Sequence, residues 1–323
     1  MNTVLVTGGT GSIGSAFVKR LLTNGDTVRV FSRDETRQYE LALEIGDSPN
    51  VRYLVGDVRD KDRLKRAMHG CNLVFHAAAL KHVPSCEYNP FEAVETNVRG
   101  TQNVIEAATD TGVSKVVLLS TDKAVNPCNV MGCTKLLAEK LITSVNQWTP
   151  SPICCAVRFG NVLGSRGSVV PTIIRQIQQG GPVTITDERM VRFVMTIEDG
   201  VDLCIMTAKE GQAGQVYVSS MQSVWVRDLA EVLIGEYSST PKAVQVITGG
   251  VRAGEKLDEE LLNQDELSRT EHKGTHFVVH AKWDKALPPC PTIQPPDYKS
   301  LDSTPMQKSE VLALLYRAGF ARP

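Results

Sequence analysis

A hydroxyl, a carboxyl and an amine stand side by side at Thr121, Asp122 and Lys123, directly after the apolar run Lys115–Ser120. A carboxyl group beside an amine can give and take protons during a reaction when both pKa values lie near neutrality. Burial would raise the pKa of Asp122 and lower that of Lys123, while their mutual attraction would oppose both shifts. The alternative interpretation is a solvated ion pair at the end of a strand.

Glycines near the chain start indicate a dinucleotide site. They follow the β-branched run Thr3–Thr7 and precede the helical pattern of Ile13–Leu22. Missing side chains let backbone amides and a helix N-terminus approach a pyrophosphate. The context of strand, turn and helix makes the motif specific, and a merely structural glycine turn is the alternative. We expect cofactor contacts from Gly8, Thr10, Gly11, Ser12, Ile13 and Gly14.

The residues after the next strands bear on the type of cofactor. The second predicted strand, Thr27–Phe31, ends at Ser32, Arg33 and Asp34 rather than at a single acid that would bind the ribose of NAD. Arg33 could bind a 2′-phosphate, which favours NADP, while Asp34 keeps NAD possible and Arg33 could simply be solvated. Further along, contacts to the adenine ring and the cofactor backbone are expected from Asp57, Val58, Ala77, Ala78 and Ala79.

Alternating strands and helices must position these groups. Strands are predicted at Thr3–Thr7, Thr27–Phe31, Val51–Val55, Leu73–His76, Lys115–Ser120 and Ile153–Arg158, and long helices at Phe91–Thr111 and Thr134–Val145. This pattern predicts an α/β fold, a Rossmann-type doubly wound parallel sheet with a smaller C-terminal substrate-binding region. We expect residues 1–165, with a returning segment near 190–220, to bind NADP, and residues 166–323 to form the nucleotide-sugar-binding region and C-terminal tail.

Composition excludes several partner classes. Lys and Arg number 35 against 36 Asp and Glu, so the net charge of −1 gives no reason to expect nucleic acid or an anionic membrane. The chain start lacks a secretory pattern, and no apolar run is long enough to span a bilayer. Eight cysteines without Cys-x-x-Cys spacing predict free thiols in a reducing cytoplasm and no metal site, with Cys154 and Cys155 on opposite faces of a strand.

Several segments resemble a known superfamily. The glycine motif together with Gly56–Asp60, Ala77–Pro84, Thr96–Thr101 and Ser120–Ala124 is similar to the extended short-chain dehydrogenases/reductases. More narrowly, Thr121–Pro127, Val191–Thr196 and Gly250–Leu257 resemble the UDP-N-acetylglucosamine 4,6-dehydratases, a polysaccharide biosynthesis protein family of bacterial and archaeal glycan pathways. These segments span most of the chain, and generic sugar-nucleotide epimerases usually lack Asp-Lys after the threonine.

The resemblance implies a reaction and roles in it. C4 of the sugar is oxidised, water is eliminated across C5 and C6, and hydride returns to C6, which yields a UDP-4-keto-6-deoxy-hexosamine and regenerates the cofactor. Asp122 would be the acid for the 6-hydroxyl and Lys123 the base at C5. Thr121 would bond the C4 hydroxyl, and Lys135 would hold the nicotinamide ribose. Lys81 and Asn97 would also contact the cofactor.

Met131 departs from the superfamily pattern, because a proton-transferring tyrosine usually stands four residues before the lysine at 135. A thioether cannot take the C4 proton. Either Met131 packs the pocket and the proton leaves through Thr121, Lys135, Lys123 or water, or the chain is a catalytically silent NADP-binding protein. Some members of the dehydratase family carry methionine here. The Asp122–Lys123 pair favours activity, because a binding protein needs no acid and base beside a hydride acceptor. A C4-epimerase and a dehydratase of another UDP-hexose also remain open.

The resemblance also implies a nucleotide-sugar pocket and an oligomer. Asn161 would contact the sugar diphosphate, Arg192 and Arg252 would converge on it, and Glu255 would accept from a ribose hydroxyl. The remaining substrate contacts are expected from Lys81, His82, Ser168, Val169, Pro171 and Thr186. The two long helices match those that pair across dimers in the superfamily, so a homo-oligomer, dimer or higher, is expected.

Overall fold

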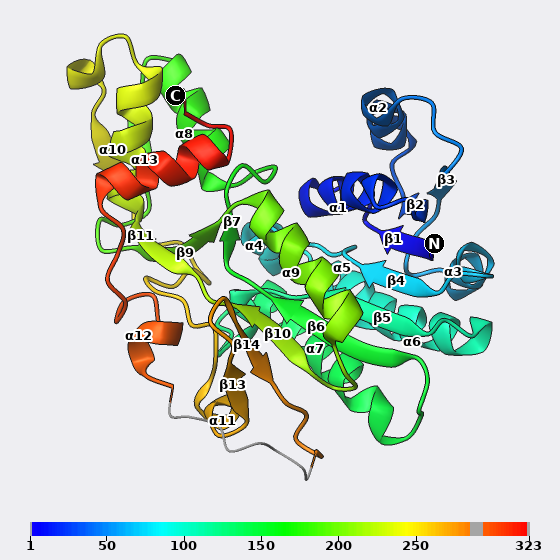
Figure 1. The fold of residues 1–323 in the computed structure, drawn as a ribbon. Coiled ribbons are helices and arrows are strands. Elements are labelled where there is room, and N and C mark those ends of the chain that lie inside the picture. Colours follow the sequence, from blue (N-terminus) through cyan, green and yellow to red (C-terminus); the bar gives the residue numbers. More distant parts are fainter. Residues whose placement is uncertain (1, 285–292, 322–323) are drawn as a thin grey trace.

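The main sheet of the computed structural model, which describes residues 2–284 and 293–321, has nine strands. Their order is β13-β14-β10-β6-β5-β4-β1-β2-β3, parallel from β3 to β10 and antiparallel at β14 and β13 (Figure 1). Apolar strands that alternate with crossover helices form such a sheet, and the predicted Rossmann-type fold is confirmed. The strands are β1 Thr3–Thr7, β2 Thr27–Ser32, β3 Val51–Val55, β4 Leu73–His76, β5 Lys115–Leu119, β6 Ile153–Arg158, β10 Val216–Ser219, β13 Thr270–His272 and β14 His276–Val279.

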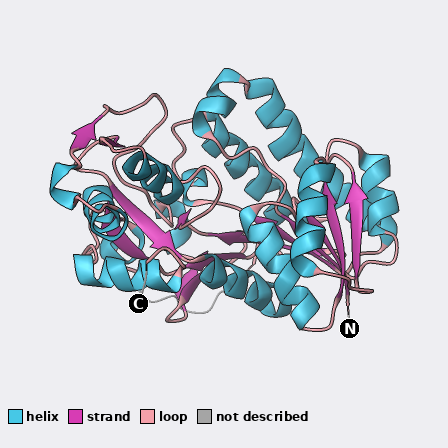
Figure 2. Ribbon diagram, turned by 90° about the horizontal axis from the view of Figure 1, so that it is seen from above, coloured by secondary structure: helices cyan, strands magenta, loops and turns pink. Residues whose placement is uncertain are grey.

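Helices cover both faces of this sheet (Figure 2). On one face lie α1 (Ser12–Thr23) and α9 (Ile197–Glu210), and on the other lie α3 (Lys61–Met68), α6 (Gly100–Thr111) and α7 (Val130–Ser144). Each face has its own apolar core. Cys154 is buried in one core and Cys155 in the other, as the strand alternation predicts, whereas Cys290 lies outside the described residues.

A smaller unit packs beside the C-terminal edge of β5 and β6. It contains a three-stranded sheet of β7 (Asn161–Val162), β9 (Val191–Met195) and β11 (Gln222–Trp225), and the pair β8 (Val183–Ile185) and β12 (Val246–Thr248). Its apolar core joins α8 (Val169–Gln178), α10 (Val226–Tyr237) and α13 (Lys308–Arg317). The later half of the chain gives β10, β13 and β14 to the main sheet, a larger share than the predicted returning segment.

One predicted helix is interrupted. In place of a continuous helix over Phe91–Thr111, the chain forms α5 (Pro90–Ala93), the π-helical segment η1 (Val94–Arg99) and then α6. Wider π turns often occur near functional sites. Here the π segment carries Asn97, whose buried side chain bonds both backbone polar groups of Leu80 and the hydroxyl of Thr134. The irregular turn therefore fixes the loop after β4 against α7.

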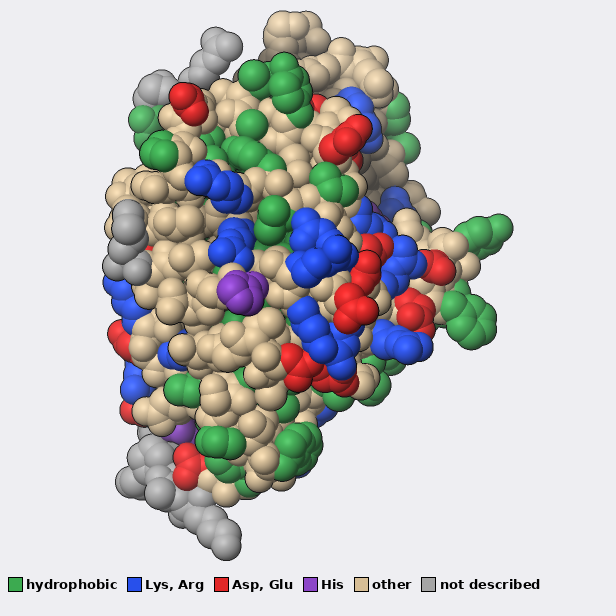
Figure 3. Space-filling model, turned by 90° about the vertical axis from the view of Figure 1, so that its right-hand side faces the viewer, with side chains coloured by type: hydrophobic (Ala, Val, Ile, Leu, Met, Phe, Trp, Pro, Cys, Tyr) green, Lys and Arg blue, Asp and Glu red, His purple; other side chains and the backbone are tan. Residues whose placement is uncertain are grey.

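Basic side chains gather on the face that carries α3 and β3, where Lys and Arg lie among Asp and Glu (Figure 3). Arg29 donates to the carbonyls of Ala67 and His69, and Arg52 donates to those of Pro49 and Val51. These guanidinium groups therefore satisfy backbone carbonyls at the sheet edge. Among the described residues, no helix combines the length and apolar character needed to cross a bilayer.

Candidate active site

The glycine loop, residues 8–14, packs closely against the end of β4. Gly8 has φ +68°, and a Cβ atom there would lie 2.8 Å from the carbonyl carbon of Ala77. A Cβ at Gly14 would clash with the Gly8 carbonyl oxygen. The loop leads directly into α1, so Ser12 and Ile13 form the first turn of a helix whose N-terminal amides face the loop. This arrangement fits the pyrophosphate of a dinucleotide.

Arg166, which the sequence reasoning missed, reaches over this loop. Its backbone N–H donates to Ser12 Oγ at 3.0 Å, and its guanidinium donates to the carbonyl of Thr10. The same charge acts on Lys81, whose side chain reaches the surface but whose pKa is lowered first by partial burial of the amine and then by Arg166. An isolated arginine in a Ser-Arg-Gly loop carries no periodic signal, and only the folded chain brings it to the glycine motif.

At the end of β2, Arg33 and Asp34 have different tasks. The Asp34 carboxylate caps α2 (Glu35–Ile45) by accepting from the Arg37 N–H at 3.1 Å. The Arg33 guanidinium is exposed and lies 3.8 Å from Asp57. Burial works to raise the pKa of Asp57, yet its hydrogen bonds with Arg59 hold that pKa below the usual range. Two further predicted cofactor residues flank this corner: Ser32 accepts from Gln38, and Val58 is buried.

The loop after β4 runs between the glycine loop and the smaller unit. The Ala77 N–H donates to the Thr7 carbonyl, and that of Ala78 donates to the Thr7 hydroxyl, with Ala79 following. Next come Lys81 and His82, both exposed, and the His82 ring lies against Gly167. Residues that are predicted to contact the cofactor and residues that are predicted to contact the sugar therefore lie in one short loop.

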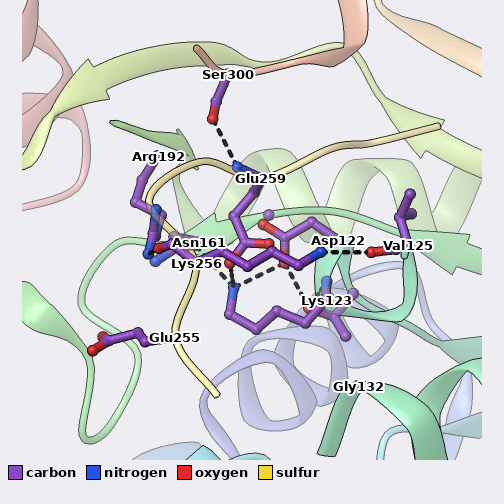
Figure 4. Close-up of polar contacts among 12 residues, drawn as sticks. Asp122, Lys123, Val125, Gly132, Asn161, Arg192, Glu255, Lys256, Glu259 and Ser300 are labelled. Carbon is purple, nitrogen blue, oxygen red and sulfur yellow. Dashed lines mark hydrogen bonds and ion pairs between the residues drawn. The ribbon is translucent and has the colours of Figure 1, made fainter. Parts of the chain in front are cut away.

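Thr121, Asp122 and Lys123 form a hydrogen-bonded chain just after β5, and Figure 4 shows its Asp122 and Lys123 side chains. Asp122 Oδ1 accepts from the Thr121 hydroxyl at 2.9 Å and from Lys123 Nζ at 2.9 Å. The Asp122 side chain has no exposed surface, and its Oδ2 has no hydrogen-bond partner among the described residues. Thr121 and Lys123 are therefore the side chains that contact the buried Asp122 carboxylate through hydrogen bonds.

Lys123 lies between two carboxylates. Its Nζ is 3.3 Å from Glu259 Oε1, besides the contact with Asp122, and donates to Asn161 Oδ1 at 3.4 Å. Burial works to lower the pKa of Lys123, but the charges of Asp122 and Glu259 raise it above the ordinary value. Of the two opposing effects that the sequence left open, attraction prevails, so Lys123 is not shifted toward neutrality and is held as an ammonium group.

Met131 and Lys135 occupy one side of α7. Met131 is buried in an apolar cluster with Cys86 and Ala93, where its thioether serves as packing. The Lys135 ammonium donates to the Leu119 carbonyl at the end of β5. Burial lowers the pKa of Lys135 to about 8, against the opposing charge of Glu139. Lys135 is thus a buried amine whose pKa lies closer to neutrality than usual, and it contacts the strand end that precedes Thr121.

The residues predicted for the nucleotide sugar lie on the smaller unit and its connections. Ser168 precedes α8, which contains Val169 and Pro171, and the buried Ser168 Oγ has no partner in the part of the chain that is described. Thr186 and Glu255 are brought together, with the hydroxyl 3.4 Å from the carboxylate. Arg192 is buried and donates to backbone carbonyls of Val191, Lys256 and Leu257, whereas Arg252 is exposed.

Comparison with known proteins supplies the family. A family model described as polysaccharide biosynthesis protein matches residues 4–281. The chain belongs to this polysaccharide biosynthesis protein family. Among the described residues of this family member, no group of three or more His, Cys, Asp or Glu side chains is arranged to hold a metal ion.

Relatives of this polysaccharide biosynthesis protein include an uncharacterized membrane protein of Methanocaldococcus jannaschii, 51% identical over 86% of the chain and 85% of the relative. A protein named UDP-glucose 4-epimerase from Rickettsia rickettsii is 42% identical over 86% and 82%. The X-ray structure of Pen from Bacillus thuringiensis superposes with a TM-score of 0.91 at 38% identity and covers 99% of this chain and 98% of its own. A Thermus thermophilus UDP-glucose 4-epimerase, solved with NAD, gives 0.67 at 25% identity, covering 78% and 88%.

A buried triad of one arginine and two glutamates was not predicted from the sequence. Arg158, at the end of β6, is 1% exposed and bonds Glu139 of α7 and Glu266 of α11 (Gln264–Leu267). The pKa of Glu266 falls to about 2, because the Arg158 charge outweighs burial. His76, likewise buried, bonds Thr7 and Thr101, and burial lowers its pKa to about 3. Both groups stabilise the framework around the site.

Proposed function

We propose that this protein is a UDP-N-acetylglucosamine 4,6-dehydratase that uses NADP. The observation that carries the proposal is the chain of hydrogen bonds from Thr121 through Asp122 to Lys123 at the end of β5. Membership of a polysaccharide biosynthesis family and relatives named for nucleotide-sugar chemistry support an NAD(P)-dependent enzyme that modifies nucleotide sugars. The finer assignment rests on the adjacent acid and amine, which an epimerase does not need.

NADP would supply a hydride acceptor for C4 and a hydride donor for C6. The glycine loop and Arg166 would bind its pyrophosphate, and Lys135 its nicotinamide ribose. Arg33 favours NADP over NAD, because its guanidinium is exposed while the neighbouring Asp34 is committed to a helix cap. NAD remains the second candidate, since the related Thermus thermophilus epimerase was solved with it.

The protein's own residues can complete the proton transfers without a tyrosine. The C4 proton passes from the Thr121 hydroxyl to the Asp122 carboxylate, and Asp122 then holds the proton that the departing 6-hydroxyl requires. Lys123 must first lose the proton that its two carboxylate neighbours stabilise, and the neutral amine then takes the C5 proton and later returns it. The elimination releases one water, and both side chains regain their starting protonation states. Met131 has no role beyond packing in this scheme.

The substrate would lie between the loop after β4 and the smaller unit. Lys81, His82 and Asn161 would face the sugar and diphosphate, with Arg252 reaching the diphosphate from the exposed segment around 250–255. Ser168, Val169 and Pro171 would line the uracil, and Thr186 with Glu255 would bind the ribose. Arg192 acts indirectly, because its guanidinium holds the backbone of the Glu255 segment. In this assignment residues 1–165 bind the cofactor and residues 166–323 bind the nucleotide sugar, as one cytoplasmic enzyme.

A homo-oligomer completes the proposal. Large apolar side chains remain exposed on α4 (Val83–Tyr88), α5 and η1, namely Tyr88, Phe91 and Val94. Such a patch marks an interaction site more often than a free surface. We expect light scattering of the purified protein to give at least a dimer, and Phe91→Glu to reduce the assembly; a monomeric wild-type protein would contradict this.

Mass spectrometry in deuterated water tests the function. Wild-type protein incubated with UDP-N-acetylglucosamine should yield a product that has lost one water and gained deuterium. Asp122→Asn and Lys123→Ala should form none. A C4-epimerase would leave the mass unchanged apart from exchange, and would tolerate Asp122→Asn. A silent binder would show ligand-induced melting shifts without turnover in any variant.

A further inference from the structure

Glu259 brings a second carboxylate to Lys123 from a distant part of the sequence. It lies in the segment between β12 and α11, and its side chain is 3% exposed. Oε1 is 3.3 Å from Lys123 Nζ, and Oε2 is buried with no hydrogen-bond partner among the described residues. A buried carboxylate with an unsatisfied oxygen is costly, so its position beside the proposed base calls for a function.

The backbone around Glu259 is tied at several points, which Figure 4 shows. Arg192 donates to the carbonyls of Lys256 and Leu257, and Lys256 Nζ donates to the carbonyl of Val125 at 3.0 Å. The Glu259 N–H itself donates to Ser300 Oγ at 2.9 Å. These bonds connect the smaller unit to the turn that carries Asp122 and Lys123. They hold the carboxylate in place without taking up its side-chain oxygens.

We propose that Glu259 is a positioning residue, which holds the Lys123 amine between two buried carboxylates and sets the pH at which Lys123 can act as a base. Lys123 points its Nζ at three oxygens, those of Asp122, Glu259 and Asn161, and its long stem would otherwise be free to rotate. Asp122 links the Lys123 amine to Thr121 on one side, and Glu259 holds the amine from the other side. The inference rests on the proposed function only in naming the proton that Lys123 takes.

The charges around Lys123 and Glu259 determine whether the loss of the Glu259 carboxylate raises or lowers the pKa of Lys123. Lys123 faces Asp122 and Glu259, with Arg192 as the opposing cation; Glu259 faces Lys123, Asp122, Arg192 and Lys256. Both carboxylates raise the pKa of Lys123, and burial together with the Asp122 charge raises that of Glu259. Replacing the Glu259 carboxylate by a neutral amide therefore lowers the pKa of Lys123.

The pH dependence of water elimination tests the proposal. A neutral Lys123 is required, so the rate should rise with pH up to the pKa of Lys123. Glu259→Gln should move this rise to lower pH by about 1 to 3 units, the usual effect of one close opposite charge, and should also lower the plateau rate. Glu259→Asp should restore most of the pH profile. A purely structural role would lower the plateau and leave the pH of the rise unchanged.

The neighbouring carboxylate provides a matched control. Glu260 accepts from Asn126 and pairs with Lys299 at 3.2 Å, outside the Lys123 contact, so Glu260→Gln should leave the profile where it is. An equal shift in Glu259→Gln and Glu260→Gln would mean a general charge effect and would overturn the proposal.

A second readout needs no substrate. Carbon NMR of protein labelled at lysine Cε, with the Lys123 signal assigned from Lys123→Arg, follows the titration of Lys123 directly. The signal should titrate at lower pH in Glu259→Gln than in wild type. An unchanged titration overturns the role of Glu259. If the titration shifts but wild-type protein leaves UDP-N-acetylglucosamine intact, the proposed function fails and the assignment of Glu259 stands.

Discussion

The Thr121 hydroxyl donates to Asp122 Oδ1 at 2.9 Å, while the carboxylate itself has no exposed surface. The acid of the proposed mechanism is thus reached through its neighbours rather than directly. In the proposed mechanism this relationship makes Thr121 the entry for the C4 proton, because the thioether of Met131 cannot accept it, and it leads to the first prediction.

Thr121→Val removes the hydroxyl and keeps the shape of the side chain. We expect C4 oxidation to slow by about 100-fold or more, the usual contribution of a positioned proton-transfer group. Single-turnover formation of reduced nicotinamide, read by its absorbance, measures this step alone. Thr121→Ser retains the hydroxyl and should oxidise C4 at close to the wild-type rate. Equal rates in the valine variant and wild type would exclude the Thr121 route.

Met131→Leu should preserve turnover, because Met131 only packs against Cys86 and Ala93. A volume-conserving apolar exchange costs less than about 1.5 kcal/mol of stability. Steady-state rates of Met131→Leu and wild type check the turnover, and urea unfolding of the same two proteins checks the stability. A leucine variant that folds normally but no longer oxidises C4 would show that the sulfur takes part in the reaction.

Arg33→Ala should weaken NADP binding and leave NAD binding unchanged, since only NADP carries the 2′-phosphate. Hydrogen bonds to charged groups contribute about 1.5–3 kcal/mol, which corresponds to roughly tenfold or more in Kd. Titration with both cofactors by calorimetry provides the comparison. Arg189→Ala removes an exposed guanidinium that pairs with Asp187, and it serves as the control. A parallel loss of NAD affinity would argue against a 2′-phosphate contact.

Arg166→Gln tests the contact proposed at the cofactor pyrophosphate, which NADP and NAD share. Because its guanidinium lies at the glycine loop, the substitution should weaken NADP and NAD alike, again by roughly tenfold. The same titrations give the answer. Selective loss of one cofactor, or no loss of either, would place Arg166 away from the pyrophosphate.

Glu266→Gln should destabilise the fold in a pH-dependent way. Breaking a buried pair with Arg158 costs about 3–5 kcal/mol near neutral pH. The pKa of Glu266 in the fold, about 2, lies below the unfolded value of roughly 4.3. Its stabilisation is therefore present above the unfolded value and is lost as pH falls toward about 2.

Urea unfolding at neutral pH and near pH 3 checks this prediction. The difference in free energy of unfolding between Glu266→Gln and wild type should be smaller near pH 3. Asp265→Asn removes an exposed carboxylate that pairs with Lys282 and, at 4.0 Å, with Arg269, and it should change stability by less than about 1 kcal/mol. A gap of constant size across the pH range would show that Glu266 is not ionised in the fold.

Local patterns were enough to predict the framework. The strand bounds from the sequence agree with β1 through β6 to within one residue, because buried parallel strands are short β-branched runs between turn residues. The glycine motif was also predictable from the sequence, because its spacing reflects the backbone contacts that exclude a Cβ atom at Gly8 and Gly14. The π turn at Val94–Arg99 was missed, because its apolar spacing resembles that of an ordinary helix.

Long-range partners were not predictable from local patterns. Glu259, Arg166 and Arg158 each act on a segment far away in the chain, and each looks like a surface charge in its own neighbourhood. One of them contributes to the Lys123 shift. Burial alone would have lowered the pKa of Lys123, and the charges of Asp122 and the distant Glu259 together raise it.

The main sheet has a consequence for how the chain can be divided. β10 pairs with β6 along three residue positions, and β14 and β13 follow it, so the edge of the first half of the chain is covered by strands from the second. A fragment ending at residue 165 would present β6 as an open edge, ready to pair with another copy. Residues 1–165 and 166–323 therefore form one cooperative folding unit, and calorimetry of the intact chain should record a single melting transition.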